Sequence, residues 1–254
     1  MENSVHVRRM VAAGVVVAAS VVAMLVTAVT STAVTVATKP LPARMKNTGG
    51  GTQLITVVSS GKTNAARTGI LTWWRRQGTT WIKVGSAPAR FGYNGLSDDR
   101  REGDGTTPTG IYTLPLAFGL KRNPGTRLPW RHVDARSWWD ENSLKPRYNT
   151  WYENCPPTTC WKATTRSAHS SEHLADYPVQ YAYAIVIGFN TGASKVLPPA
   201  RPSGSGIFLH VNGAGYTAGC ISMPRSSLIA LLRWLNPATK PHIVIGNSAS
   251  ITRF

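Results

Sequence analysis

A cysteine and a histidine in one short stretch are the residues of this chain best suited to chemistry. The stretch runs His210-Val-Asn-Gly-Ala-Gly-Tyr-Thr-Ala-Gly-Cys220-Ile-Ser-Met-Pro, directly after the apolar residues 206–209. A cysteine nucleophile needs a base to take its proton and backbone N–H groups to hold an oxyanion. His210 could be that base or a partner cation. A turn at Gly219 could aim the N–H groups of Gly219 and Cys220 at a carbonyl oxygen.

A helix is predicted just after the cysteine, with Pro224 at its first position and Asn236-Pro237 at its end. Its apolar face consists of leucines: Leu228, Leu231, Leu232 and Leu235. The positive end of this helix would point toward Cys220 and lower the pKa of its thiol. Thr217 could hydrogen-bond within the same site. The alternative is a buried cysteine with a structural role only.

Short β-branched runs separated by turn residues predict strands along most of the chain. The candidates are residues 53–58, 69–76, 79–84, 110–114, 182–187, 207–210 and 243–245, and Gln77-Gly78 joins the second and third as a hairpin. Residues 115–180 have weak periodicity. We expect long loops there, with a short helix near 170–175, which could cover an active site. The pattern indicates a mostly β domain, a sandwich or a barrel-like sheet.

Composition limits the partners of this domain. With 42% hydrophobic residues and nine Trp in 254 residues, the chain can bury a core. The formal net charge of +17 suits an anionic surrounding, such as an acidic wall polymer or an anionic membrane surface. Lys/Arg runs interleaved with aromatic residues are missing from the sequence, which argues against nucleic-acid binding. The pairs Trp73-Trp74 and Trp138-Trp139 fit packing better than sugar stacking.

The N-terminus predicts export. Arg8 and Arg9 precede 29 consecutive uncharged residues, from Met10 to Thr38. This arrangement is typical of a signal peptide or a membrane anchor in residues 1–38, and its length favours a retained hydrophobic helix as anchor. Residues 39–51 are interpreted as a linker, residues 52–247 as the catalytic domain and residues 248–254 as a C-terminal tail.

Two further cysteines, Cys155 and Cys160, flank Pro-Pro-Thr-Thr. In an exported protein they favour a disulfide, although with His169 and His173 they also approach the spacing of a zinc site. A disulfide would leave Cys220 as the odd thiol. The acidic stretch from Asp98 to Asp104 is interpreted as a solvated loop with internal ion pairs rather than a cation site.

Two motifs together resemble the L,D-transpeptidase catalytic (YkuD-type) family. The first is His210-x-x-Gly213 followed by Thr217-x-Gly219-Cys220-Ile221, and the second is the upstream stretch Gly105-Thr-Thr-Pro-Thr-Gly-Ile-Tyr112. The resemblance covers residues 52–247. Its middle section, with residues 172–178, is similar to the actinobacterial secreted branch.

The resemblance implies a β-sandwich-like fold with long loops, one helix after the catalytic cysteine, and peptidoglycan stem peptides as substrate. Cys220 would form a thioester with a stem peptide, with His210 as base and then proton donor. An amine from a neighbouring stem would resolve the thioester. The same residues would serve an L,D-carboxypeptidase, in which water resolves it. No metal or organic cofactor is needed for either reaction.

The sequence departs from the family pattern at two places. Ala218 stands where the family has a histidine before Gly-Cys, and Val211-Asn212 displaces the glycine that follows the first histidine. A wall-binding or scaffold protein with a weak catalytic site is therefore a further alternative. We expect Asn212, Tyr216 or His173 to orient the thiolate in place of the missing histidine. The predicted substrate contacts are Asn212, Gly213, Tyr216, His173 and Tyr177.

Overall fold

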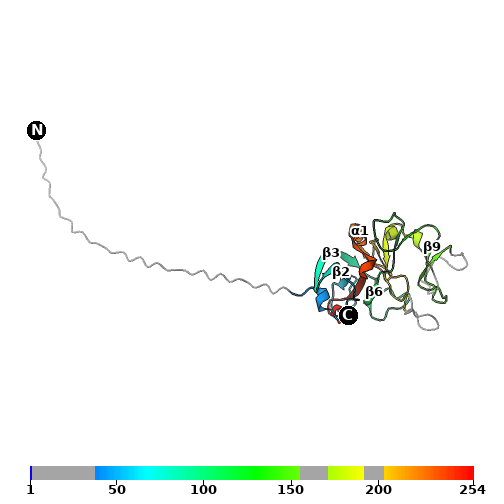
Figure 1. Ribbon diagram of the computed structural model, residues 1–254, viewed down its shortest axis with the longest axis horizontal. Coiled ribbons are helices and arrows are strands. Elements are labelled where there is room, and N and C mark those ends of the chain that lie inside the picture. Colours follow the sequence, from blue (N-terminus) through cyan, green and yellow to red (C-terminus); the bar gives the residue numbers. More distant parts are fainter. Residues whose placement is uncertain (2–37, 155–170, 192–202) are drawn as a thin grey trace. The chain divides into compact units, whose positions relative to one another are not determined.

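The computed structural model describes residue 1 and residues 38–154, 171–191 and 203–254. Lys39–Phe254 form one compact unit, and its described residues are drawn in colour in Figure 1. The predicted signal peptide or anchor, residues 1–38, lies outside the described residues except at its two ends. Of the helices that are described, none is both long and apolar enough to cross a membrane.

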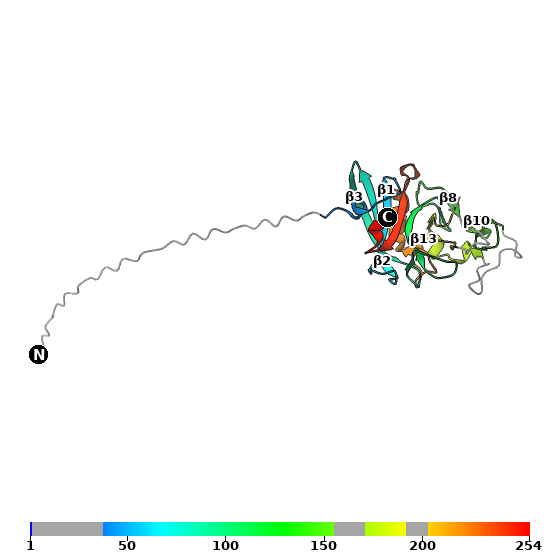
Figure 2. The ribbon, with the colours of Figure 1, turned by 90° about the horizontal axis from the view of Figure 1, so that it is seen from below.

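A ten-stranded sheet forms the frame of this unit. The strands lie in the order β6 (Gly110–Thr113), β15 (His242–Asn247), β1 (Gln53–Ser59), β2 (Thr68–Gln77), β3 (Thr80–Arg90), β14 (Ile221–Met223), β13 (Phe208–Val211), β12 (Ala184–Val186), β7 (Ala117–Gly119) and β8 (Trp130–His132). The pairs β1/β15, β13/β14 and β7/β8 are parallel and the other neighbours are antiparallel. In Figure 2, β13 lies between the β1–β2–β3 end and the β8 end. The fold is mostly β, as the sequence predicts.

Every strand predicted from the sequence is present, with shifted ends. The hairpin of β2 and β3 turns at Gln77↔Thr80, where Gly78 has a φ of +57° that suits a tight hairpin turn. β3 continues to Arg90, well beyond the predicted end, and this extension brings it alongside β14 at Ser222↔Arg90. β12 is shorter than predicted. The extension of β3 connects the hairpin to the strands that carry the histidine and the cysteine.

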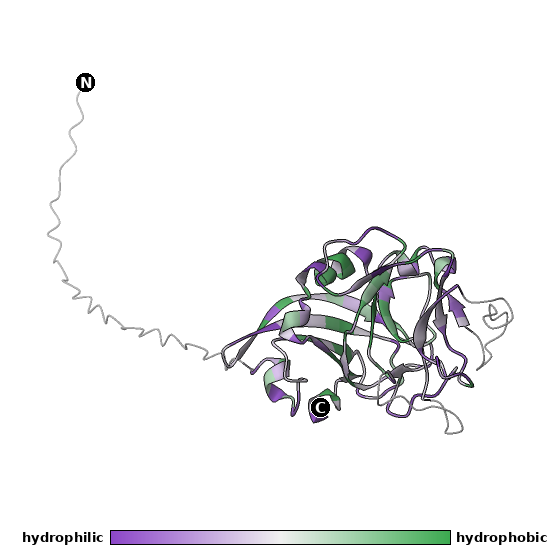
Figure 3. Ribbon diagram, turned by 45° about the vertical axis from the view of Figure 1, so that its right-hand side comes forward, coloured by the Kyte–Doolittle hydropathy of each residue, from purple (hydrophilic) through white to green (hydrophobic). Residues whose placement is uncertain are grey.

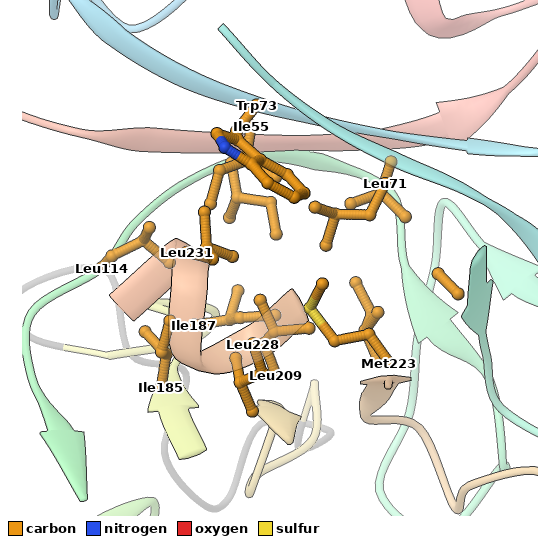
Figure 4. Close-up of a cluster of buried hydrophobic side chains, with 14 of the residues drawn as sticks. Ile55, Leu71, Trp73, Leu114, Ile185, Ile187, Leu209, Met223, Leu228 and Leu231 are labelled. Carbon is orange, nitrogen blue, oxygen red and sulfur yellow. The ribbon is translucent and has the colours of Figure 1, made fainter. Parts of the chain in front are cut away.

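The helix α1 (Arg225–Trp234) begins one residue after Pro224 and covers one face of the sheet. Its predicted apolar residues are fully buried: Leu228, Leu231, Leu232 and the following Leu235. Figure 4 shows Leu228 and Leu231 directed at Ile55, Leu209 and Met223 of the sheet. In Figure 3 the hydrophobic residues concentrate along the strands and α1. This apolar burial stabilises the packing of β13 and β14 against α1.

The middle of the chain is more regular than predicted. Besides β7 and β8 it contains a three-stranded sheet in the order β10 (Thr150–Glu153), β9 (Ser137–Asp140) and β11 (Ser171–His173). The expected helix near residues 170–175 is wrong in its first half, because residues 171–173 form β11. The 3-10 helices η2 (Leu174–Asp176) and η3 (Gln180–Ala182) follow. Partner strands far apart in the sequence supply the pairing that local periodicity did not reveal.

Short elements complete the unit. β4 (Leu96–Ser97) pairs with β5 (Thr107–Pro108), and the 3-10 helices η5 (Pro237–Thr239) and η6 (Ile251–Arg253) lie near the C-terminus. Residues 39–51, interpreted above as a linker, contain the 3-10 helix η1 (Leu41–Arg44). Leu41 and Met45 pack against a buried cluster with Leu54 and Trp81. The compact unit therefore starts before the predicted domain boundary.

Candidate active site

The parallel register of β13 and β14 divides their side chains between two faces. Leu209 lies opposite Ile221, and both belong to the main apolar core under α1. Side chains alternate along a strand, so Phe208, His210 and Cys220 belong to the other face. Phe208 is buried in a second cluster, and Cys220 packs against that cluster. The predicted base and nucleophile thus lie on the same face of the same strand pair.

The thiol of Cys220 is held by the backbone just before and at the start of β13. The Phe208 N–H donates to Sγ at 3.3 Å, and the S–H donates to the Gly206 carbonyl oxygen at 3.1 Å. Burial, followed by the negative charge of Glu172, raises the pKa of the Cys220 thiol to about 12. The expected lowering of this pKa by the helix is wrong. Strand β14 and Pro224 separate Cys220 from α1, and burial dominates.

His210 is 6% exposed, and burial lowers the pKa of its imidazole to about 4. Its Nδ1 lies 2.8 Å from the Val211 carbonyl oxygen. A carbonyl only accepts hydrogen bonds, so Nδ1 carries the proton and Nε2 keeps its lone pair in the neutral ring. The ring of Tyr181 meets His210 edge to face, with centroids 5.6 Å apart. The neutral imidazole is in the tautomer that can accept a proton at Nε2.

The turn before Cys220 is held by two threonines. Thr217 Oγ1 donates to the Cys220 carbonyl oxygen and accepts from the Gly219 N–H at 3.2 Å. Thr107 Oγ1 donates to the Gly219 carbonyl oxygen at 2.7 Å. Gly219 has a φ of +148°, and a Cβ there would lie 2.9 Å from the Thr106 carbonyl oxygen. Thr217 therefore contacts the site as predicted, and only glycine fits at 219.

The loop after β13 carries three predicted substrate contacts. The Asn212 N–H donates to Met223 O, and the side-chain Oδ1 of Asn212 is buried without a hydrogen-bond partner in the described part of the chain. The Gly213 carbonyl oxygen accepts from Arg90 Nη1 at 2.9 Å. Tyr216 is 49% exposed. These positions form an accessible edge next to His210, and their role in binding stays a prediction.

The two predicted contacts from the middle of the chain differ in position. Tyr177 packs on Tyr181 at 5.3 Å between ring centroids, and the nearby Glu172 carboxylate raises its pKa to about 12. The ring nitrogens of His173 lie 2.8 Å from Asp176 Oδ1 and 3.0 Å from the Ala135 carbonyl oxygen. The structure thus brings Tyr177 to the site, whereas the described contacts of His173 lie elsewhere.

Two half-buried carboxyl groups near Cys220, those of Glu172 and Glu141, were missed in the sequence. Glu172 lies opposite Trp139 across β11 and β9, and Trp139 packs edge to face on Phe208 with centroids 5.0 Å apart. Glu141 follows β9, and a Cβ at Gly206 would lie 2.4 Å from its Oε1. Burial raises the pKa of Glu172 to about 7 and that of Glu141 well above its usual range. Only the pairing of the small sheet could have revealed them.

Arg100 is a third charged residue near Cys220, and it lies in the loop that the sequence predicted to be solvated. The predicted internal ion pairs are present, with Arg100 Nη1 2.7 Å from Asp104 Oδ1 and Arg101 Nη2 2.6 Å from Asp99 Oδ1. However, Arg100 is only 6% exposed rather than solvated. Its guanidinium lies against Gly219, where a Cβ would be 3.0 Å from its Cζ. The loop therefore supplies a positive charge next to the cysteine turn.

The remaining candidates lie in the core or outside the described residues. Trp73 and Trp139 are buried, and Trp138 lies against His173, which supports packing roles. Within the described ranges, no group of three His, Cys, Asp or Glu could hold a metal ion. Cys155 and Cys160 lie outside those ranges, together with His169. The predicted disulfide, and the zinc alternative, stay predictions.

Comparison with known proteins identifies the family. Residues 52–245 match the family described as YkuD, L,D-transpeptidase catalytic domain, so the chain belongs to this family. Membership supports an L,D-transpeptidase-type function on peptidoglycan. A search of curated proteins found no match to the chain.

Solved structures give more distant similarities. Bd1075 of Bdellovibrio bacteriovorus is 17% identical with a TM-score of 0.40, over 80% of this chain and 50% of that one. Pgp2, the helical cell shape determining protein of Campylobacter jejuni, is 15% identical with a TM-score of 0.40, over 82% and 54%. The chain thus spans about half the length of these two proteins.

Proposed function

We propose that this protein is an L,D-transpeptidase that transfers peptidoglycan stem peptides through a thioester on Cys220. The observation that carries the proposal is the placement of Cys220 and His210 on one face of β13 and β14, with the lone pair of His210 on Nε2. Membership in the catalytic-domain family supports the substrate class. The reaction needs a thiol, a base and oxyanion donors, and this strand pair supplies candidates for each.

In the first step, the Sγ–H proton moves to His210 Nε2 while Sγ forms a bond with the carbonyl carbon of the stem peptide. The resulting oxyanion collapses, the C–N bond breaks, and His210 gives its proton to the leaving amine of the terminal D-residue. A thioester remains on Cys220. In the second step, an amine of a neighbouring stem attacks the thioester and releases the thiol.

The N–H groups of Gly219 and Cys220 are the proposed oxyanion donors. In the free protein the Gly219 N–H is bonded to Thr217 Oγ1 at 3.2 Å. An oxyanion would compete with the threonine hydroxyl for this donor, and a charged acceptor makes the stronger bond. Thr217 would then act by keeping the turn rigid, since it also donates to the Cys220 carbonyl oxygen.

The free protein holds its nucleophile as a neutral thiol. Both the raised pKa of Cys220 and the lowered pKa of His210 favour a neutral pair over a thiolate–imidazolium pair at neutral pH. The S–H also points at the Gly206 carbonyl oxygen. Productive binding must turn this S–H toward His210. This resting state is the observation that favours the second candidate function, a wall-binding scaffold with a weak catalytic site.

Substrate contacts are proposed on the accessible edge of the site. Tyr216 and Tyr177 are 49% and 39% exposed, and Asn212 and Gly213 connect the edge to β13. His173, the remaining predicted contact, precedes η2 and is bonded to Asp176 and Ala135, so a role in binding would need the substrate to extend beyond this edge. The +17 charge would hold the exported protein against anionic wall polymer or membrane, and residues 1–38 would tether it to the membrane.

Intact-protein mass spectrometry tests the proposal. The full chain and its Cys220→Ala variant are incubated with a carbapenem and with a stem tetrapeptide. We expect a covalent adduct that the variant lacks. Cross-linked products indicate transpeptidation, whereas free tripeptide indicates an L,D-carboxypeptidase. A folded wild-type protein that forms no adduct would support the scaffold function instead.

A further inference from the structure

We propose that Tyr181 and Glu172 form a positioning pair that orients His210 beside Cys220. The inference rests on the proposed function, because His210 must be oriented only if it exchanges a proton with Cys220.

Tyr181 is fixed on the side of His210 that faces away from the main core. It is 4% exposed, and its ring meets His210 at an interplanar angle of 86° with centroids 5.6 Å apart. The same ring packs edge to face on Phe208 and Phe118, at 5.7 and 5.4 Å. Edge-to-face contacts favour one relative orientation of two rings, so a fixed Tyr181 restricts the plane of the imidazole.

Glu172 anchors Tyr181 at the other end of its side chain. The Tyr181 hydroxyl lies 2.9 Å from Glu172 Oε1 and 3.0 Å from Oε2, and it donates to this carboxylate. Glu172 is held in β11 opposite Trp139. A carboxyl oxygen accepts this bond whether or not Glu172 is ionised, and the bond strengthens above about pH 7, where the carboxylate form predominates. Tyr181 and Glu172 therefore connect β11 of the three-stranded sheet to the imidazole of His210 on β13.

The three residues that the sequence suggested for this orienting role have other neighbours. Tyr216 lies under the Arg67 guanidinium, and His173 is bonded to Asp176 and Ala135. The Oδ1 atom of Asn212 has no hydrogen-bond partner in the described residues. By contrast, Tyr181 contacts the His210 ring directly. This difference selects Tyr181 and, through it, Glu172.

A test must separate two effects of Glu172: its hydrogen bond to Tyr181, and its charge, which changes the pKa of the Cys220 thiol. The charges around Cys220 come from Glu172 of β11, Glu141 after β9 and Arg100 of the loop before β5, and the two carboxylates raise the pKa of the thiol. Removing Glu172 thus favours the thiolate while it releases Tyr181. Alkylation by iodoacetamide requires only the thiolate, whereas acylation also requires a placed base. The ratio of the two rates isolates the placement of His210.

The experiment compares full-length wild type with Tyr181→Phe, Glu172→Ala, their double variant and Glu172→Gln. Acylation by a carbapenem is followed by intact mass, and iodoacetamide alkylation is followed against pH. We expect Tyr181→Phe and Glu172→Ala each to lower the acylation-to-alkylation ratio about 10-fold, as for a misplaced catalytic group. The double variant should fall no further than the worse single variant, because both remove one bond.

Glu172→Gln keeps an acceptor oxygen for Tyr181 but removes the charge. Its ratio should stay within about threefold of wild type, while its alkylation profile moves to lower pH because the pKa of Cys220 falls. A merely structural role would not produce this split. Tyr112→Phe is the matched control. This variant also removes a tyrosine hydroxyl from a half-buried side chain, where the hydroxyl donates to the Thr109 carbonyl oxygen and the ring packs on Phe189.

Near-UV circular dichroism establishes which variants are folded. If Tyr181→Phe does not fold, the ratios of Glu172→Ala and Glu172→Gln are compared instead, and a loss in the first variant alone supports the positioning role. Ratios equal to wild type in Tyr181→Phe and Glu172→Ala, or additive losses in the double variant, would overturn the positioning role. Failure of the proposed function looks different, because wild type itself would then form no carbapenem adduct.

Discussion

The two faces of the β13–β14 pair have opposite characters. On the inner face, Leu209 and Ile221 are fully buried beneath α1. On the outer face, His210 and Cys220 lie among aromatic rings, with the half-buried carboxyl group of Glu172 nearby. Apolar burial on the inner face stabilises the fold, whereas desolvation of the ionisable groups on the outer face costs free energy. Alternation along β13 therefore directs Leu209 into the main core and the candidate base His210 to the opposite face.

The largest effect is expected from the nucleophile. Cys220→Ala should remove adduct formation and lower turnover roughly 10³-fold or more, because the variant lacks the Sγ atom on which the proposed thioester forms. Stability should change little, since alanine fits a position next to Gly219. Turnover of a stem tetrapeptide, measured by product mass, checks this. Residual turnover near the wild-type rate would place the chemistry outside this face.

His210→Gln should lower acylation by about 10² to 10⁴-fold, the range of a lost general base. Glutamine is polar and of similar length, so the sheet should remain intact. Single-turnover acylation by a carbapenem measures the effect. Wild-type acylation in this variant would show that another group takes the Cys220 proton.

Leu209→Ala tests the inner face. We expect a loss of about 2–5 kcal/mol in the free energy of unfolding, because a fully buried leucine leaves a cavity. Acylation per folded molecule should stay within about 10-fold of wild type. Denaturant unfolding and the acylation assay, run on the same sample, separate the two quantities. An acylation loss as large as that of His210→Gln would contradict the view that the inner face serves packing and not the reaction.

The smallest effect is a pH dependence of stability from His210. Its pKa is about 4 when folded and 6.5 ordinarily, so between these values the unfolded chain binds a proton that the folded chain lacks. Stability conferred by the neutral ring is therefore full above about pH 6.5 and is lost as the pH falls toward 4, by at most about 3 kcal/mol.

The raised pKa of Glu172 acts in the opposite direction, with stability falling as the pH rises through about 7. This contribution is common to wild type and His210→Gln, so the difference between their unfolding free energies from pH 4 to 7 isolates His210. A difference that does not vary with pH would mean that the imidazole is not buried as a neutral group.

Local sequence was sufficient for the elements that bury a clear apolar pattern. The strand at residues 53–58 and the leucine face of α1 were predicted because their periodicity reports burial directly. The small sheet β10-β9-β11 was missed, because strands of only three or four residues show little periodicity of their own and depend on cross-strand pairing. The pKa of Cys220 was predicted in the wrong direction, since the sequence does not show the burial and the carboxylates around it.

The motifs at residues 105–112 and 210–221 were enough to place the chain in its family, and they suggested Cys220 and His210 as nucleophile and base, because such motifs depend on residue types at fixed spacing. The requirement for glycine at position 219 became clear only from the structure, in which its φ is +148° and a Cβ would lie 2.9 Å from the Thr106 carbonyl oxygen. Only the tertiary structure decided what surrounds the thiol. Glu172, Glu141 and Arg100 come from three separate segments. Their placement depends on sheet pairing and on the folding of loops over one another, and these long-range contacts leave no local pattern in the chain.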